Sequence, residues 1–563
     1  MIRKVTIHNF KSIHKQTYDF EQFDLIIGRN NSGKSTVLQA LAIWQYCIDE
    51  FLRKPKRKSR GVGVVLPNFT ALPVPEFNLL WRGRTDRHNV KGKQEYILIE
   101  IDVHWEKEGK SYNFNIQLRY QSPQSIYAIP AGGWQKFEQL NEKQLFPSIA
   151  FVPPFSGLEP VEKRYDGGNI RQQIGKAQPG SILRNLLLQV HEESSQNKHK
   201  DWEELRKAVK EWFSVDLLPP QYEKGVSTQI ICEYKENDKR YDIISGGSGF
   251  HQTLTLLAFL YGYHPTTILL DEPDAHLHVN LQQEIIKYFK RQSLDRGTQF
   301  LVATHAETLI KEVDVSNVVS LLSQKPKRIQ NKENIMQAMA EVTNLEATQI
   351  LNTEAVLYVE GEDDERILGM WEKTLSLDFL RKVFVRYMGG GSKADMLKRS
   401  NSHFKAIKEI VPEAKRLILI DNDGSPHAEP NNAAIYEWKR KNIENYLLVA
   451  PAWKKALYKI TGTTESDLFA PHEALGMIDK YFKKQGLVLP EEQEWKTLSA
   501  NIFEEVNGKK ILYENSDSLF HQLRKEKMEL KKDFVAASML PEEIHEDIIK
   551  FFKKLDSIVS TKR

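Results

Sequence analysis

The stretch LIIGRNNSGKSTVLQAL, residues 25 to 41, constrains the fold more than any other part of this sequence. It contains the pattern G-x-x-x-x-G-K-[ST], preceded by an apolar run at residues 23 to 27 and followed by an apolar-periodic segment at residues 36 to 48. The run predicts a strand, and the periodic segment predicts a helix. A glycine-flanked loop at a helix N-terminus wraps an anion with its backbone N–H groups. We therefore expect an α/β fold with a phosphate-binding loop.

This loop is predicted to bind the phosphates of a nucleotide, although by itself it does not distinguish a kinase from a GTPase or a motor protein. Lys34 is placed to reach the β- and γ-phosphates, and the Ser35 hydroxyl can ligate Mg²⁺. The predicted nucleotide-binding residues of the loop are Gly28, Asn30, Asn31, Ser32, Gly33, Lys34, Ser35 and Thr36.

A second group of residues suited to ATP hydrolysis follows far along the chain. The segment TTILLDEPDAHLH, residues 266 to 278, is an apolar strand that ends in Asp271 and Glu272. Asp271 suits Mg²⁺ coordination, and Glu272 suits polarisation of the attacking water. A serine-glycine turn, ISGGSGF, precedes this strand, and His305 follows it in FLVATHA.

This order of motifs resembles the ABC-type ATPases. The resemblance implies that Ser245, Gly246 and Gly247 touch the γ-phosphate bound by a partner subunit. It also implies that His305 senses this phosphate. The chain is then expected to form a homodimer or a higher homo-oligomer. Transporters carry a glutamine after these glycines, and this chain does not. The departure favours soluble relatives of the SMC and RecF types, although no long heptad segment separates the two ATPase halves here.

Composition excludes several other classes of protein. No apolar run approaches the ~20 residues that cross a bilayer, and the N-terminus lacks the apolar core of a signal peptide, so we expect a cytoplasmic protein with no membrane partner. Only two cysteines are present, which excludes a disulfide framework and a cysteine-rich zinc site. A net charge of +4, from 79 basic and 75 acidic residues, does not by itself indicate nucleic acid.

A second candidate site lies in the C-terminal half. The apolar segment AVLYV is followed by Glu360, and the apolar segment RLILI is followed by Asp421, Asn422 and Asp423. Residues i and i+2 of a strand point the same way, and α/β sheets place their sites at the carboxyl ends of strands, so Glu360, Asp421 and Asp423 can converge on one cation. Oxygen ligands of this kind suit Mg²⁺ or Mn²⁺ in phosphodiester chemistry.

A glutamate at one strand end with D-x-D at another resembles the TOPRIM domain of topoisomerases, primases and a group of nucleases. An ABC-type ATPase joined to a TOPRIM unit resembles the OLD (overcoming lysogenization defect) family of nucleases, which is similar to the Gabija- and PARIS-type anti-phage proteins. The resemblance implies a second metal position and a catalytic lysine. Asp364 and Glu444 match the second metal position, and Lys532 is the candidate lysine. A surface helix residue remains the alternative for Glu444, and an uninvolved lysine for Lys532.

These patterns predict an N-terminal ABC-type P-loop ATPase with an inserted helical subdomain, followed by a C-terminal TOPRIM Rossmann-like domain and a helical tail. A length of 563 residues suggests three or four domains, and residues 95 to 120 predict a β-hairpin appended to the ATPase sheet. The expected segments are residues 1 to 155 (ATPase N-half with the hairpin), 156 to 225 (inserted helices and dimer contact), 226 to 325 (ATPase C-half), 326 to 352 (linker), 353 to 465 (TOPRIM) and 466 to 563 (helical tail).

The expected function is an ATP-regulated endonuclease that depends on Mg²⁺ or Mn²⁺ and acts in anti-phage defence, with a second defence-system protein as a candidate partner. The family favours DNA as substrate, while RNA, including tRNA, stays open because a TOPRIM site contacts phosphates more than bases. Two alternatives also stay open. One is an ATP-gated sensor with a non-catalytic TOPRIM domain, and the other is an SMC- or RecF-like DNA repair ATPase. Whether ATP activates or restrains cutting is also open.

Overall fold

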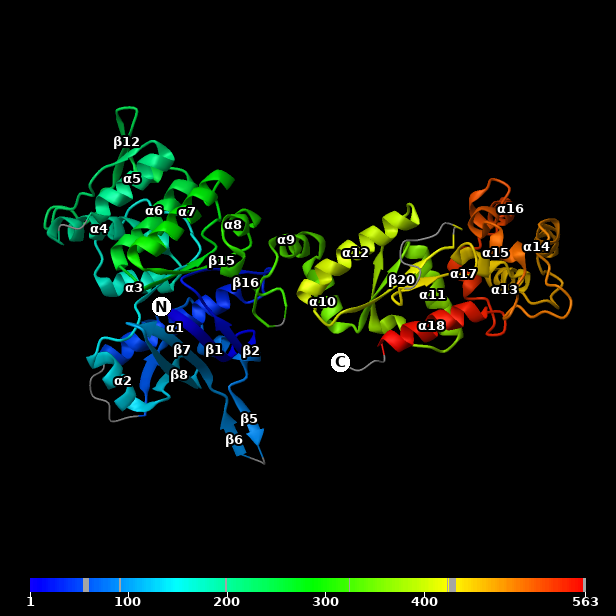
Figure 1. Cartoon of the computed structure of the whole chain (residues 1–563), viewed down its shortest axis with the longest axis horizontal. Helices are drawn as coiled ribbons and strands as arrows, with labels where there is room; N and C mark the ends of the chain where they lie inside the picture. Colours follow the sequence, from blue (N-terminus) through cyan, green and yellow to red (C-terminus); the bar gives the residue numbers. More distant parts are fainter. Residues whose placement is uncertain are drawn as a thin grey trace. The chain divides into compact units, whose positions relative to one another are not determined.

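The computed structural model describes residues 1–53, 60–90, 93–197, 200–323, 325–422, 424 and 432–559. The chain divides into two compact units, Met1–Met336 and Gln337–Arg563. The first unit runs from blue to green in Figure 1, and the second from green through yellow to red.

A mostly parallel sheet forms the centre of the first unit. Its strand order is β10-β14-β15-β3-β16-β17, and only β17 is antiparallel to its neighbour. Every residue of the three middle strands is buried, as expected for a parallel sheet that is covered on both faces. The strands are β3 (Phe23–Ile27), β10 (Ile149–Val152), β14 (Thr267–Asp271), β15 (Gln299–Thr304), β16 (Val318–Ser320) and β17 (Lys327–Arg328), and the helices that follow or precede them are α1 (Lys34–Arg53), α6 (Ser248–Tyr263), α7 (Val279–Arg296) and α8 (Glu307–Glu312).

A second, antiparallel sheet lies in the same unit, with the order β2-β1-β7-β8-β9-β4. Its strands are β1 (Ile2–Phe10), β2 (Ile13–Asp19), β4 (Val62–Val65), β7 (Ile99–Lys107), β8 (Lys110–Ser122) and β9 (Ser125–Pro130). The hairpin β7-β8 pairs with β1 and not with the sheet that contains β3. The expectation that the hairpin extends the ATPase sheet was therefore wrong. Inward residues of β7 alternate with solvent-facing ones, and this face packs on α1 in one apolar core.

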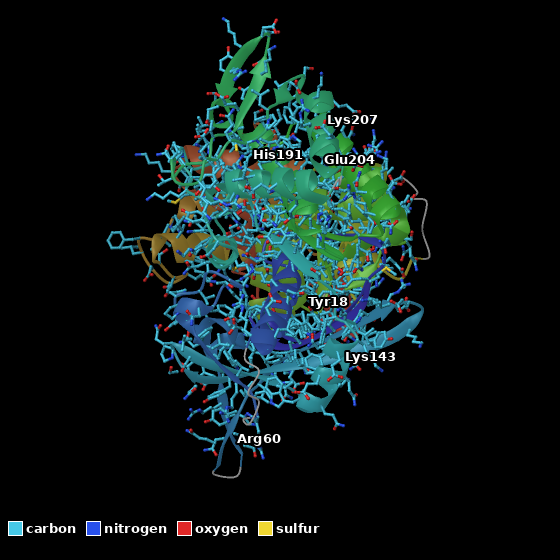
Figure 2. The ribbon with its side chains drawn as sticks, turned by 90° about the vertical axis from the view of Figure 1, so that its left-hand side faces the viewer. Tyr18, Arg60, Lys143, His191, Glu204 and Lys207 are labelled. Atoms are coloured by element: carbon cyan, nitrogen blue, oxygen red, sulfur yellow. The ribbon has the colours of Figure 1, made fainter. Side chains whose placement is uncertain are left out.

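Helices occupy much of the chain between β10 and β14. They are α3 (Gly167–Gly175), α4 (Leu183–Asn197) and α5 (Asp201–Phe213), followed by the small sheet of β11 (Asp216–Leu217), β12 (Glu233–Glu236) and β13 (Lys239–Asp242). Helices α4 and α5 lie on the opposite side of the first unit from the antiparallel sheet (Figure 1), and the labelled His191 and Glu204 are likewise separated from Lys143 in Figure 2. Arg296 of α7 donates to Asp201 and Glu204 of α5, which ties the helical region to the ATPase core.

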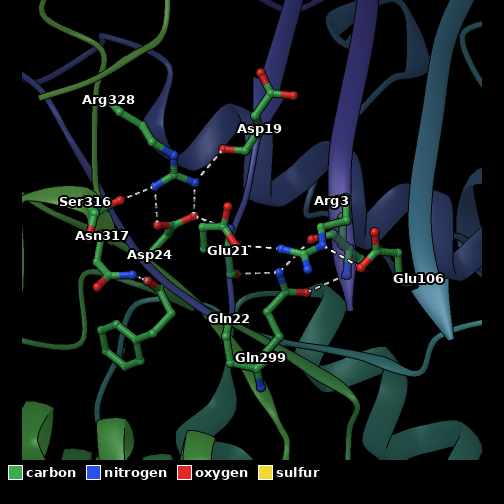
Figure 3. A network of polar contacts seen from close by, with 12 residues as sticks. Arg3, Asp19, Glu21, Gln22, Asp24, Glu106, Gln299, Ser316, Asn317 and Arg328 are labelled. Carbon is green, nitrogen blue, oxygen red and sulfur yellow. Dashed lines mark hydrogen bonds and ion pairs between the residues drawn. The ribbon is translucent and has the colours of Figure 1, made fainter. Parts of the chain in front are cut away.

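A polar network closes the edge of the parallel sheet (Figure 3). Asp24 of β3 is fully buried, and both of its carboxylate oxygens accept from the guanidinium of Arg328, at 2.8 and 2.9 Å. Burial nevertheless raises the pKa of Asp24, although the arginine opposes the rise. Gln299 of β15 joins the two sheets, because its amide exchanges hydrogen bonds with the backbone N–H and carbonyl of Ile2.

The second unit contains a four-stranded parallel sheet with the order β19-β18-β20-β21. Its strands are β18 (Ala355–Val359), β19 (Val383–Tyr387), β20 (Lys415–Ile420) and β21 (Ile435–Glu437), and its helices include α9 (Lys332–Glu341, at the boundary of the units), α10 (Asn344–Asn352), α11 (Glu362–Thr374), α12 (Lys393–Ile410), α13 (Ala450–Thr461), α14 (His472–Lys484), α15 (Asn501–Glu505), α16 (Leu519–Lys525), α17 (Lys532–Ala536) and α18 (Glu546–Val559). One apolar core joins the sheet to the C-terminal helices, from Ala355 to Val559.

The expected segments thus merge into two units. The predicted linker contains two helices, and the division between units falls inside the first of them, α9. No separate compact unit corresponds to residues 466 to 563, because Phe551 and Phe552 of α18 pack into the same core as β18 and β20.

Replacement of Arg328 by methionine should destabilise the first unit by about 3 kcal/mol, because it leaves the buried Asp24 carboxylate without its cation. Lys287→Met removes an exposed partner of Glu284 and should change stability by less than about 0.5 kcal/mol. Urea unfolding of both variants measures the difference. Equal stability of the two variants would contradict this account of the sheet edge.

Candidate functional site

The phosphate loop, residues 28 to 35, connects β3 to α1. Its tight course depends on glycine, since a Cβ on Gly28 would lie 2.4 Å from Ser32 Oγ and Gly33 has a φ of +95°. Asn31 also adopts a left-handed conformation, with a φ of 64°. The buried Lys34 ammonium donates to the carbonyl oxygens of Gly28 and Arg29, at 3.0 and 2.9 Å. The carbonyl groups of the loop thus fix the position of the Lys34 ammonium near the end of β3.

Asp271 lies beside this loop because β14 and β3 both pair with β15 in parallel. Ser35 Oγ donates to Asp271 Oδ1 at 2.8 Å. Burial raises the pKa of Asp271 to about 6, against the effect of the Ser35 hydrogen bond. A hydroxyl and a carboxylate at this position fit the oxygen ligands that Mg²⁺ prefers, so Ser35 and Asp271 would hold a nucleotide-bound ion.

Glu272 and His305 face each other at the ends of the two neighbouring strands, β14 and β15. His305 Nδ1 is 3.4 Å from Glu272 Oε1. Glu272 has a left-handed φ of 51°, and its N–H donates to the carbonyl of Ala303. The pairing with β15 therefore fixes the backbone of the predicted water-polarising residue.

A cavity of about 670 Å³ opens above these residues. Two residues that the sequence analysis missed line it, Lys11 and Ser12, which lie in the turn between β1 and β2. Burial lowers the pKa of Lys11, while the Asp271 carboxylate opposes the decrease. The full lining is Lys11, Ser12, Asn30, Asn31, Gly33, Lys34, Ser35, Thr36, Glu272 and His305. Two lysines thus converge on the place where phosphates are expected.

The turn that contains Ser245, Gly246 and Gly247 lies at the start of α6. These three residues are not among those that line the cavity of the same chain. Gly246 packs on Phe250, since a Cβ there would lie 2.4 Å from that ring. Gly249 approaches the carbonyl of His276, which places the start of α6 next to the loop that follows Glu272.

The second candidate site lies at the carboxyl ends of β18 and β20. Glu360 follows β18, Asp421 follows β20, Asp364 belongs to the first turn of α11, and Glu444 is buried in a 3₁₀ turn, Ile443–Leu447. Burial, and then the charges of Asp364, Glu444 and Glu360, raise the pKa of Asp421 to about 8. Burial likewise raises the pKa of Asp364 to about 7, and its neighbours Glu444 and Glu360 add to the rise. Four of the predicted carboxylates therefore repel one another at this edge.

Lys532 contacts this group of carboxylates. Its ammonium donates to Glu444 Oε1 at 2.8 Å and to Asp363 Oδ2 at 2.7 Å. Burial opposes the charge on Lys532, but Glu444 and then Asp363 outweigh it and raise the pKa of the lysine. Lys532 thus shares a site with Glu444, although 88 residues separate them in the chain.

The ligand types at this edge fit Mg²⁺ or Mn²⁺, and the repulsion among the carboxylates would be relieved by a cation. Among the residues that the structure describes, no three Asp, Glu, His or Cys side chains stand close enough to form a ready ligand set. Asp423, the second aspartate of the predicted D-x-D pair, lies outside the described residues.

Further residues at this edge do not belong to any motif that the sequence analysis recognised. Burial opposes the charge on Lys509, but the charges of Glu444 and Glu360 outweigh this effect and raise its pKa. Tyr513 is partly buried, its ring lies 5.6 Å from Lys532 Nζ, and its hydroxyl has no hydrogen-bond partner within the described ranges. Gly390 lies next to Glu360, since a Cβ there would be 3.7 Å from Glu360 Oε1.

The family model of the AAA ATPase domain matches residues 1–144 and 169–310, just over half of the chain. The chain belongs to this family. The matched residues all fall in the first unit and include the phosphate loop, Asp271, Glu272 and His305. The prediction of an α/β ATPase domain that binds ATP is confirmed.

The chain is also similar to a curated protein, Endonuclease GajA from Bacillus cereus (strain VD045). The two are 22% identical over 407 residues, which cover 66% of this chain and 67% of that protein. The matched 66% of this chain is longer than the first unit, which has 336 residues, so the similarity extends into the second unit.

Among solved structures, SMC head domains match the chain at a low level. The SMC head domain from Thermotoga maritima has 14% identity and a TM-score of 0.31, and covers 57% of this chain and 94% of that one. A head domain with an extended coiled coil from Pyrococcus furiosus has 15% identity and a TM-score of 0.34, and covers 60% and 98%. Within the part of the chain that the structure describes, no helix is long and apolar enough to cross a membrane.

Two variants separate nucleotide binding from hydrolysis. Lys34→Ala removes the ammonium at the phosphate loop and should abolish ATP binding, measured with a fluorescent ATP analogue. Glu272→Gln should bind ATP but release phosphate on the order of a hundredfold more slowly.

Glu307→Gln, an exposed change in the first turn of α8, serves as the control and should leave both properties unchanged. Normal phosphate release by Glu272→Gln would show that another group polarises the water.

Proposed function

We propose that this chain is an ATP-regulated, metal-dependent endonuclease of the OLD type, with the ATPase in the first unit and a TOPRIM nuclease site in the second. The observation that carries the proposal is the group of carboxylates at the ends of β18 and β20, with Lys532 hydrogen-bonded to one of them. The similarity to an endonuclease, which extends into the second unit, supports the same reaction class.

In this proposal Glu360, Asp421 and Asp423 hold one divalent ion, and Asp364 with Glu444 hold a second. When bound, the ions supply an activated water and stabilise the leaving oxygen of the phosphodiester. The residues of the chain orient these ions and the strand. Lys532 balances the charge of Glu444 and, in this proposal, contacts a phosphate oxygen of the substrate.

ATP acts through the first unit. We propose that two chains form a homodimer or a higher homo-oligomer in which Ser245, Gly246 and Gly247 of one subunit meet the γ-phosphate on the phosphate loop of the other. Two features support this arrangement: the turn does not line the cavity of its own chain, and it follows the motif order of ABC-type ATPases. Mg²⁺ on Ser35 and Asp271 would accompany the nucleotide.

The substrate in this proposal is nucleic acid, with DNA favoured by the family and RNA or tRNA as the alternative. The family also suggests a role in anti-phage defence with a second defence-system protein.

One observation favours a second candidate, an ATP-gated sensor with a non-catalytic second unit. Among the described residues, no three metal-binding side chains lie close enough together to hold an ion. In addition, Glu444 already accepts a hydrogen bond from the Lys532 ammonium. The other alternative, an SMC- or RecF-like DNA repair ATPase, also fits the fold of the first unit.

Asp421→Asn tests the nuclease. The change keeps the size of the side chain but removes a charged metal ligand, so cutting in Mg²⁺ or Mn²⁺ should fall by on the order of a hundredfold or more. Phosphate release from ATP should stay within a few-fold, because Ser35 and Asp271 lie in the other unit. Supercoiled DNA, linear DNA and total tRNA are the substrates, each with and without ATP.

Asp378→Asn is the matched control, since Asp378 is an exposed carboxylate of the same unit that pairs with Arg381. It should cut as the parent does. A parent chain that cuts none of these substrates, or an Asp421→Asn chain that cuts normally, would reject the nuclease and leave the sensor.

A further inference from the structure

Arg184 is a buried arginine whose contacts connect the helical region to the Ser245–Gly247 turn. It lies in the first turn of α4, and its side chain is 2% exposed. Its guanidinium donates to both carboxylate oxygens of Asp242, at 2.7 and 2.9 Å, and to the carbonyl of Pro160. A two-pronged pair of this kind fixes direction as well as distance.

Asp242 transmits this contact to the turn. Its carboxylate accepts the N–H of Ile244 at 2.9 Å, which caps the short 3₁₀ helix Ile243–Ser245. The carbonyl of Ile243 in turn accepts from His251 Nε2, and the N–H of Gly246 donates to the same carbonyl. The arginine thus holds Asp242 at one end of this turn, and α6 holds the carbonyl of Ile243 through His251.

The helix that carries Arg184 is itself anchored. The buried carboxylate of Glu162 accepts the backbone N–H groups of Arg184 and Asn185 and the side-chain amide of Asn185. Burial raises the pKa of Glu162 to about 7, although these hydrogen bonds oppose the rise. The start of α4 therefore has little freedom to shift relative to the segment around Glu162.

We infer that Arg184 is a positioning residue for ATP hydrolysis, which acts through Asp242 to hold Ser245, Gly246 and Gly247 in the conformation that meets the γ-phosphate on a partner subunit. The inference rests on the two-subunit ATP site of the proposed function. It assigns α4 and Glu162 a role in the reaction, although none of these residues lines the nucleotide cavity.

Arg184→Met should therefore lower the turnover of ATP on the order of tenfold to a hundredfold, as expected for a misplaced contact group, while ATP affinity stays within about twofold. Arg164→Met is the control, because Arg164 pairs with Glu192 of the same helix α4 at a half-buried position. It should leave turnover unchanged. Should Arg184→Met fail to fold, Arg184→Lys replaces it, since lysine keeps the charge but loses the two-pronged geometry.

Heterodimers isolated with two affinity tags locate the defect. In the proposed dimer, each ATP site combines the phosphate loop of one chain with the Ser245–Gly247 turn of the other. When one chain carries Lys34→Ala and the other carries Arg184→Met, one ATP site therefore contains both substitutions and the other contains neither. We expect this dimer to keep roughly half of the wild-type turnover, as the reference dimer of Lys34→Ala with Ser245→Arg should.

An inactive Arg184→Met heterodimer beside an active reference dimer would show that Arg184 serves the nucleotide of its own chain, and would overturn the inference alone. Loss of ATP affinity in Arg184→Met would also overturn it. An inactive reference dimer would overturn the two-subunit site and the inference with it.

Discussion

The parallel pairing of strands is the constraint on which both candidate sites depend. Since β3 and β14 both pair with β15, the phosphate loop, Asp271 and His305 meet at one edge, although Ser35 and Asp271 are 236 residues apart in the chain. The same rule brings Glu360 and Asp421 together in the second unit, because β18 and β20 are parallel neighbours. Each site follows from the order of strands rather than from any single motif.

The two edges differ in how their charges are balanced. At the ATPase edge, Asp271 accepts from Ser35, and two lysines line the cavity nearby. At the second edge, Asp421 and Asp364 have raised pKa values because burial is combined with neighbouring carboxylates. Lys532 donates to Glu444 of this group and to the neighbouring Asp363. A surplus of negative charge in a buried place is costly without a counterion, and in the proposed function a divalent cation would supply it.

Local spacing made the phosphate loop predictable, since a strand, a glycine pattern and a helix follow one another within a few residues. The sequence analysis missed Lys11 because this residue lies in a short turn between β1 and β2. The packing of that turn brings Lys11 to the cavity at the phosphate loop.

The sequence analysis did not predict that the C-terminal helices share an apolar core with the sheet of the second unit. The apolar residues of α18 are visible in the sequence, but the strands that they cover lie more than a hundred residues earlier. Lys532 and its neighbour Lys531 are chemically alike, and only the start of α17 decides which of them meets Glu444.

The central claim is that one chain holds two independent metal sites, one with nucleotide and one without. Electron paramagnetic resonance of bound Mn²⁺ tests it directly. The nucleotide-free chain should bind Mn²⁺ at the second unit, and a non-hydrolysable ATP analogue should add an ion that the Lys34→Ala chain does not gain. A chain that binds no Mn²⁺ without nucleotide, or whose binding is unchanged in Asp421→Asn, would contradict the account.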